Sequence, residues 1–288
     1  MTRLHLIRRL QACVLVALGA AACGDSTGTG RATLTVALTD APDAYFKSVM
    51  VEIGEIEIIS ASGAPTSIVA SGGPYDLLML QNGATASLAS LDLEPGTYLQ
   101  LRLVINSVDV TLADGFSFAD GAQSMGVIIP SGAQTGIKIN LDGADGDAQS
   151  AGVEIRPGET VLVIDFDVSQ NFVLLGNPDT GGVINGVVFT PLLRATVLDI
   201  AGSIAGNVSV PVVVDPSGIT VMAEQTDSGL LEALQTPTAT ALTDANGNYQ
   251  IMFLAPGTYD VKVEGQATSL SVTVGDGQDV TAQDFTIQ

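Results

Sequence analysis

Asp165 and Asp167 are the two residues whose types and spacing come nearest to catalytic chemistry in this 288-residue sequence. They stand two positions apart in the apolar run Val161–Val168, and a strand would place their side chains about 7 Å apart on one face. Two carboxylates at such a separation can carry out glycoside hydrolysis. The same alternation is typical of the solvated outer face of an antiparallel strand. We favour this second interpretation, because no residue pattern places another acid across a cleft.

Other acidic residues gather in glycine-rich turns, where carboxylates can hold Ca²⁺. Asp142, Asp145 and Asp147 form one such group, and Asp244 begins another. Neither group follows the spacing of an EF-hand loop, because neither ends in the required glutamate. We interpret the first as a solvated acidic loop and the second as a hairpin turn, and we predict no metal site. Asp40, in the segment TDAP, is interpreted as a turn residue.

The start of the sequence has the features of a secretory signal. Arginines at positions 3, 8 and 9 precede an apolar run, Leu10–Ala22, that ends in small residues before Cys23. The run is shorter than the ~20 residues that span a bilayer. It resembles a bacterial lipoprotein signal, in which cleavage before the cysteine exposes a thiol for diacylation. An ordinary signal with an incidental cysteine is the alternative.

This resemblance implies that residues 1–22 are a signal peptide, that Cys23 is the lipidated N-terminus, and that residues 23–30 form a short tether. The membrane lipid would then be a partner of the chain through Cys23. Gly24 follows Cys23, in place of the aspartate that commonly retains lipoproteins at the inner membrane. We therefore expect a lipid-anchored protein of the cell envelope, on the outer membrane if the organism has one.

The composition excludes several classes of function. The formal net charge is −21, with 10 Lys and Arg against 31 Asp and Glu, so nucleic acid is not expected as a partner. The sequence has no tryptophan, one histidine, His5, and two cysteines, Cys13 and Cys23. Cleavage before Cys23 would remove His5 and Cys13. The remaining chain would lack the residues for a serine or cysteine triad or a histidine–cysteine zinc site, and we predict no cofactor.

Period-two alternation of apolar and polar residues dominates the sequence after residue 30. Leu34, Val36 and Leu38 share one parity, and many such segments are separated by DG, NG and PG turns, which predicts an all-β protein of two β-sandwich domains in tandem. The alternation changes parity at Gly54-Glu55, which predicts a β-bulge. Ala84–Ser90 is the best candidate for a short helix.

Two stretches resemble known families. Residues 31–199 contain LTVALTDAPDAYFKSVMVEIGEIEI, DLLMLQNGATASLASLDLEPGTYLQLRLVI and VLVIDFDVSQNFVL. In this order the segments resemble an uncharacterised domain family of bacterial and archaeal envelope proteins, which implies no known activity. Residues 202–288 contain GSIAG, TDANGNYQI, LAPGTYDVKV and a closing VTVGDGQDVTAQDFTI. This stretch resembles a carboxypeptidase regulatory-like domain, which implies a transthyretin-like sandwich of the carbohydrate-binding-like type. The tetrapeptide PGTY occurs in both stretches, and we interpret it as a shared turn.

Exposed aromatic rings are the usual platform for sugars, and the first stretch offers three candidates. Tyr45 and Phe46 follow a turn, and Tyr75 follows Gly-Gly-Pro. Caps at a sandwich edge are the alternative interpretation of these rings. We expect a non-enzymatic binding or scaffolding module of the envelope, with polysaccharide or an envelope protein as its partner. The alternative is a carboxylate-based glycoside hydrolase or another surface enzyme.

Overall fold

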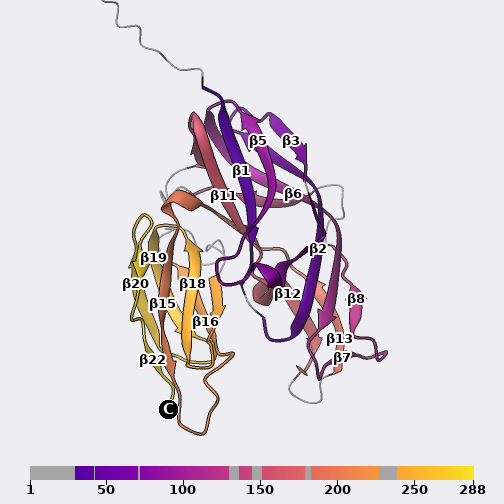
Figure 1. The fold of residues 1–288 in the computed structure, drawn as a ribbon, viewed down its shortest axis with the longest axis vertical. Helices are drawn as coiled ribbons and strands as arrows, with labels where there is room; N and C mark the ends of the chain where they lie inside the picture. Colours follow the sequence, from indigo (N-terminus) through magenta and orange to yellow (C-terminus); the bar gives the residue numbers. More distant parts are fainter. Residues whose placement is uncertain are drawn as a thin grey trace, which may run out of the picture.

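The computed structural model describes residues 30–41, 43–70, 72–129, 136–144, 151–178, 183–226 and 239–288. The expected signal peptide, Cys23, and the acidic residues Asp145 and Asp147 lie outside these ranges. The described chain folds into two β-sandwiches, each with its own buried core (Figure 1). The all-β prediction of two tandem sandwiches is confirmed. No helix among these residues is long and apolar enough to cross a membrane.

The first sandwich is built from two main sheets and a smaller third one. The first sheet has the order β14-β11-β1-β5, formed by Arg194–Val197, Gly158–Asp165, Ala32–Thr39 and Ala86–Leu93. The second has the order β10-β6-β2-β3, formed by Val153–Ile155, Gly96–Leu112, Phe46–Ser60 and Pro65–Val69. Short strands pair with this second sheet: β4 (Tyr75–Asp76) with β2, and β8 (Ser124–Gly126) and β9 (Ile137–Asn140) with β6. The third has the order β12-β13-β7, formed by Phe172–Gly176, Val183–Phe189 and Ser117–Phe118.

Local alternation explains most strands of the first sandwich. In β1, Leu34, Val36 and Leu38 are fully buried, as their common parity predicts. The expected short helix at residues 84–90 is wrong: Ala86–Leu93 is strand β5, because pairing with β1 decides the conformation of residues with weak local preference. The helices whose bounds lie within the described residues are elsewhere: η1 (Leu77–Leu80), α2 (Val168–Asn171) and η3 (Leu198–Ile200).

The predicted bulge in β2 is confirmed. Ile53 pairs with Ile105 and Glu55 with Val104, so Gly54 has no partner across the ladder. The structure adds a second bulge directly opposite, because Glu52 pairs with Ser107 and leaves out Asn106. The two insertions offset each other, and the buried face of β2 therefore continues unbroken.

β1 and β11 run parallel in the centre of the first sheet, with Ala32 opposite Gly158 and Thr39 opposite Asp165. Their carboxyl ends therefore meet at the same edge of the sheet. Both faces are buried there, from Val36 to Thr39 on β1 and from Leu162 to Asp165 on β11. This edge lies beside the second sandwich (Figure 1).

The second sandwich packs two four-stranded sheets face to face. One has the order β18-β15-β21, formed by Asn248–Leu254, Gly202–Ser209 and Asp279–Val280, with β22 (Phe285–Thr286) also on β15. The other has the order β17-β16-β19-β20, formed by Ala239–Leu242, Thr220–Gln225, Gly257–Val263 and Ser269–Val274. As the alternation predicts, Tyr249, Ile251, Tyr259, Val261 and Val263 face its core. Strict alternation from Tyr249 would also turn Phe253 inward, but Phe253 lies outside the core, because β18 carries an irregularity after Ile251.

Candidate functional site

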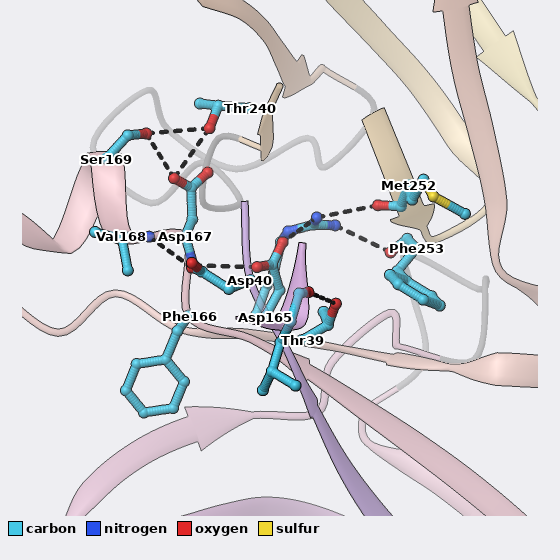
Figure 2. Close-up of polar contacts among 12 residues, drawn as sticks. Thr39, Asp40, Asp165, Phe166, Asp167, Val168, Ser169, Thr240, Met252 and Phe253 are labelled. Carbon is cyan, nitrogen blue, oxygen red and sulfur yellow. Dashed lines mark hydrogen bonds and ion pairs between the residues drawn. The ribbon is translucent and has the colours of Figure 1, made fainter. Parts of the chain in front are cut away.

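Three aspartates from two distant segments of the sequence meet where the two sandwiches touch. Asp40 follows β1, and Asp165 ends the parallel neighbour β11, so the sheet itself brings these two together. Asp167 stands two residues later, with a φ of 39° in the left-handed region that turns the chain into α2. The exposed fractions of Asp40, Asp165 and Asp167 are 6%, 5% and 3%. Together with Arg194, we call these residues the seam cluster (Figure 2).

The prediction that Asp165 and Asp167 share a solvated outer strand face is wrong. The strand ends at Asp165, so Asp167 does not continue its alternation, and the second sandwich covers both side chains. Asp40 does stand where the chain leaves β1, but it also contributes a buried contact: its Oδ1 accepts a hydrogen bond of 2.9 Å from the backbone N–H of Val168. Asp165 Oδ1 likewise accepts from the backbone N–H of Asp167, at 3.0 Å.

Arg194 joins the two sandwiches through its guanidinium group. Nη2 forms an ion pair with Asp165 Oδ2, and the two side chains are 11% and 7% exposed. On the other side, Nη1 donates to the carbonyl of Phe253 at 3.0 Å and Nη2 to that of Met252 at 3.3 Å (Figure 2). Phe253 has a φ of 55°, in the left-handed region, and lies at the irregularity in β18. The two carbonyls that bind Arg194 therefore belong to this irregular part of the strand.

Asp167 forms the second polar contact across the boundary. Its Oδ1 accepts from the hydroxyl of Ser169 at 2.7 Å and from that of Thr240 at 3.0 Å. Ser169 belongs to α2 of the first sandwich and Thr240 to β17 of the second, and their hydroxyls lie 3.0 Å apart. A single carboxyl oxygen therefore contacts side chains of both sandwiches.

The seam cluster contains three carboxyl groups but a single guanidinium. Asp40 Oδ2 and Asp167 Oδ2 are buried and have no hydrogen-bond partner among the described residues. Burial, followed by the charge of Asp165, raises the pKa of Asp40 well above 3.8. The same two causes raise the pKa of Asp167 to about 7. Desolvation dominates both shifts, because a buried carboxylate loses the hydration that favours its charged form.

The space beside the cluster suits a very small occupant. A cavity of about 30 Å³ is lined by Asp40, Asp165, Arg194, Thr240 and neighbouring residues. This volume is comparable to one water molecule and far below that of a sugar ring. In the described part of the chain, no group of three or more His, Cys, Asp or Glu residues has an arrangement that could hold a metal ion.

The three aromatic candidates lie in different surroundings. Tyr45 is half-buried and lines a cleft of about 260 Å³ between the sandwiches, together with Asp43, Ser169 and Glu264. Phe46 is 5% exposed and packs edge-on against Phe172 in the core.

Tyr75 of β4, also half-buried, donates its hydroxyl hydrogen to the carbonyl of Ser87 of β5 in the first sheet, at 3.5 Å. A wider groove of about 590 Å³ lies near Arg31 and Asp92, and its one aromatic residue, Tyr98, is buried. The structure therefore does not bring the three rings into one platform.

Reasoning from the sequence missed Arg194 and Thr240. Neither stands in a recognisable motif, and both act through partners from other parts of the chain. One signal was available: few basic residues occur in a strongly acidic chain, so a lone arginine beside an apolar strand indicates a buried carboxylate partner.

Comparison with solved structures finds only weak similarity. The Bacillus anthracis TIE protein is 10% identical with a TM-score of 0.21, and the match covers 90% of this chain and 34% of that one. A leucine-rich repeat protein from Bacteroides thetaiotaomicron is 10% identical with a TM-score of 0.23, and the match covers 90% of this chain and 26% of that one. This chain therefore spans 34% of the first protein and 26% of the second. BcpA, the major pilin subunit of Bacillus cereus, is 10% identical with a TM-score of 0.23, and the match covers 89% of this chain and 98% of that one. Similarities this weak assign no function.

Comparison with protein families is more informative. No curated protein matches the chain. Residues 193–288 match the carboxypeptidase regulatory-like domain, and residues 31–184 match the domain of unknown function DUF4382. The two matches follow the order that the sequence motifs predict. Since the DUF4382 match, over residues 31–184, spans more than half of the sequence, the chain belongs to the DUF4382 family.

Proposed function

We propose that this chain is a non-enzymatic, lipid-anchored protein of the cell envelope, in which two sandwiches act together as one binding or scaffolding unit. The observation that carries the proposal is the Arg194 contact, which ties Asp165 of the first sandwich to two backbone carbonyls of the second. A buried guanidinium held from both sides favours a fixed arrangement of the sandwiches, because separating them would break its hydrogen bonds to the carbonyls of Met252 and Phe253.

The main alternative is an enzyme that uses Asp165 and Asp167 as its acid and base. The raised pKa of Asp167 is a feature that such an enzyme would need. However, the carboxylates of a glycosidase must flank a bound sugar, and the cavity here has a volume of about 30 Å³. The two residues already have partners: Asp165 binds Arg194, and Asp167 binds Ser169 and Thr240. These contacts favour a structural role over catalysis.

The test of catalysis is turnover of a panel of chromogenic glycosides by the purified protein. We expect none above a buffer blank, with or without Ca²⁺. Turnover that Asp165→Asn or Asp167→Asn abolishes, in variants that still fold, would establish the enzyme in place of the module.

Anchoring through Cys23 is the second part of the proposal. Two or more acyl chains hold a protein stably at a membrane, at ~0.8 kcal/mol per buried CH₂ group. We expect Cys23→Ser to release the protein from the membrane fraction, and Cys13→Ser, a matched control at the other cysteine, to leave it there. Retention of the Cys23→Ser protein would contradict the anchor without affecting the test of catalysis.

The ligand is the third part, and the interdomain cleft is the place where we expect it. Tyr45 offers a half-buried ring there, in a cleft that Asp43 and Glu264 also line. Acidic walls repel anions, so a neutral or cationic polysaccharide is the class that fits. We expect glycan-array binding by neutral or amino sugars that Tyr45→Ala weakens and Tyr75→Ala does not. Binding that survives Tyr45→Ala would place the ligand elsewhere.

A further inference from the structure

We propose that protons held on Asp40 and Asp167 keep the seam between the two sandwiches closed, so that the contact between the sandwiches weakens as the pH rises from acidic towards neutral. This inference goes beyond the proposed function, because it depends on neither the lipid anchor nor the ligand.

The charge count of the seam cluster is the first observation. Asp40, Asp165 and Asp167 would carry three negative charges if all were ionised, against one positive charge on Arg194. The guanidinium directly pairs with Asp165 alone. An unpaired charge away from water costs several kcal/mol, and in practice such a carboxyl group takes up a proton.

The two oxygens without partners are the second observation. Asp40 Oδ2 and Asp167 Oδ2 are buried, whereas the Oδ1 atom of each residue already accepts hydrogen bonds. A proton on each Oδ2 removes the charge and keeps every contact of Oδ1. The hydrogen bonds from Val168, Ser169 and Thr240 are therefore compatible with the neutral acids.

Among the described residues, the surroundings supply no other charge that could replace these protons. The charged groups acting on Asp40 are Asp165 and Asp167, and those acting on Asp167 are Asp165 and Arg194. The second sandwich contributes β17 and β18 to this place, and the residues of these strands that line the adjoining cavity are Thr240, Gln250, Met252 and Phe253. None of these side chains titrates. Asp43 and Glu264 line the separate cleft next to the seam cluster, and both are acids.

The direction of the pH effect follows from where each state binds the proton. In the closed state the pKa of Asp167 is about 7, raised by burial and then by Asp165. Opening the seam would admit water and return the group towards its ordinary value of 3.8. Between these two values the closed state holds the proton more tightly, so each pH unit of increase can lower the ratio of closed to open protein up to about tenfold. Asp40, whose pKa is raised in the same direction, reinforces the effect.

The experiment measures the distance between the sandwiches at several pH values in the full chain. Nitroxide labels on cysteines replacing Ser67 in β3 and Ser271 in β20, both exposed, report it by electron–electron double resonance in a Cys13→Ser, Cys23→Ser background. Carboxyl carbon NMR follows the protonation of Asp40 and Asp167 in the same samples. We expect one narrow distance distribution at acidic pH, and a broader, longer one as the pH passes the titration of Asp167.

Variants separate this device from a general effect of pH. Asp167→Asn is neutral at every pH and keeps an acceptor oxygen for Thr240, so its distance distribution should stay narrow where the wild type broadens. Asp114→Asn removes an exposed acid, paired with Lys47 on the surface, and should behave as the wild type does.

Three outcomes would overturn the proposal, and the first two need no variant. One is a distance distribution that does not change with pH. Another is titration of both carboxyl groups in the ordinary aspartate range. The third is a change, caused by added Ca²⁺ and reversed by a chelator, in the pH at which the distance distribution broadens. That result would assign a cation to the cluster in place of protons.

Discussion

Thr240 donates its hydroxyl hydrogen to Asp167 Oδ1 across the boundary between the two sandwiches, at 3.0 Å. Asp167 is 3% exposed and Thr240 5%, so this hydrogen bond is shielded from water. The contact joins β17 of the second sandwich to the turn that precedes α2 of the first. It therefore couples the protonation of one side chain to the fit between two domains.

Replacing Thr240 with valine should destabilise the protein by about 1 kcal/mol, the typical value of one hydrogen bond. The Thr240 hydroxyl lowers the pKa of Asp167, so its loss should raise that pKa above about 7. Urea denaturation and carboxyl NMR measure the two effects. Thr240→Ser keeps the hydroxyl and should leave the pKa in place. An unchanged pKa in Thr240→Val would contradict the contact.

Replacing Arg194 with methionine should be far more costly. The variant leaves Asp165 buried without its ion pair and removes the donor to the carbonyls of Met252 and Phe253. Removing one partner of a buried pair typically costs about 3–5 kcal/mol. Arg156→Met is the matched control, because its ion pair with Glu154 is exposed and such pairs contribute about 0–1 kcal/mol. Similar losses in both variants would rule out a buried role for Arg194.

The free energy of unfolding should fall as the pH rises towards neutral. Asp167 has a pKa of about 7 in the folded chain and 3.8 as its ordinary value. The folded state therefore binds the proton more tightly, and this stabilisation is complete below the lower value and lost by the upper one. Its slope is at most about 1.4 kcal/mol per pH unit for one proton.

Urea titrations of the wild type and Asp167→Asn at several pH values isolate that contribution as the difference between their slopes. Asp244→Asn provides a control of opposite sign. Hydrogen bonds from the Asn248 side chain and from the Asn248 and Asn246 backbones lower the pKa of Asp244, so its contribution is lost as the pH falls. Identical slopes for the wild type and Asp167→Asn would show that Asp167 holds no extra proton.

The two PGTY segments make the same tyrosine corner in different sandwiches. The hydroxyl of Tyr98 donates to the carbonyl of Glu94 at 2.8 Å, and that of Tyr259 to the carbonyl of Ala255 at 2.6 Å. Each tyrosine-to-phenylalanine change should cost about 1 kcal/mol. Hydrogen exchange should locate the loss in the first sandwich for Tyr98→Phe and in the second for Tyr259→Phe. Each variant controls for the other, and losses spread over both sandwiches would be evidence against separate corners.

Gly206→Ala should destabilise the second sandwich. A Cβ at this position of β15 would lie 2.0 Å from the backbone carbonyl oxygen of Gln283, so the backbone has to move. Overpacking of this kind costs about 1–3 kcal/mol. Gly186→Ala in β13 is the control, since its Cβ would meet Leu175 Cδ1 at an ordinary 3.6 Å. Calorimetry should show a lower melting temperature for Gly206→Ala alone, and equal melting temperatures would refute the close approach.

Features that depend on neighbouring residues could be predicted from the sequence. Alternation located β1 and β2, and the change of parity located the bulge at Gly54. Both could be predicted because successive side chains of a strand point to opposite faces, so the buried face is visible as every second residue. The bulge at Asn106 was not predicted, although the buried residues of β6 change parity there too, from Leu103 and Ile105 to Val108 and Val110. The helix expected at residues 84–90 failed because alanine and serine give little local signal there.

The seam cluster could not be predicted, because it depends on pairings between distant segments. Asp165 and Asp167 were recognised as an unusual pair, but their burial follows from the parallel pairing of β11 with β1 and from the second sandwich. The residues near Thr240 and Arg194 in the sequence do not indicate which aspartate each of them contacts. Local patterns therefore gave the strands and left the polar contacts between domains to the structure.

The parallel pairing of β1 with β11 also sets the order in which the chain can fold. β1 is the first strand of the described chain, yet one of its two neighbours ends at Asp165, after most of the first sandwich has been made. A contact between segments so far apart requires closure of a long loop before it contributes any stability, and such topologies fold slowly. During synthesis, the growing chain therefore leaves one edge of β1 without its partner strand until β11 has emerged.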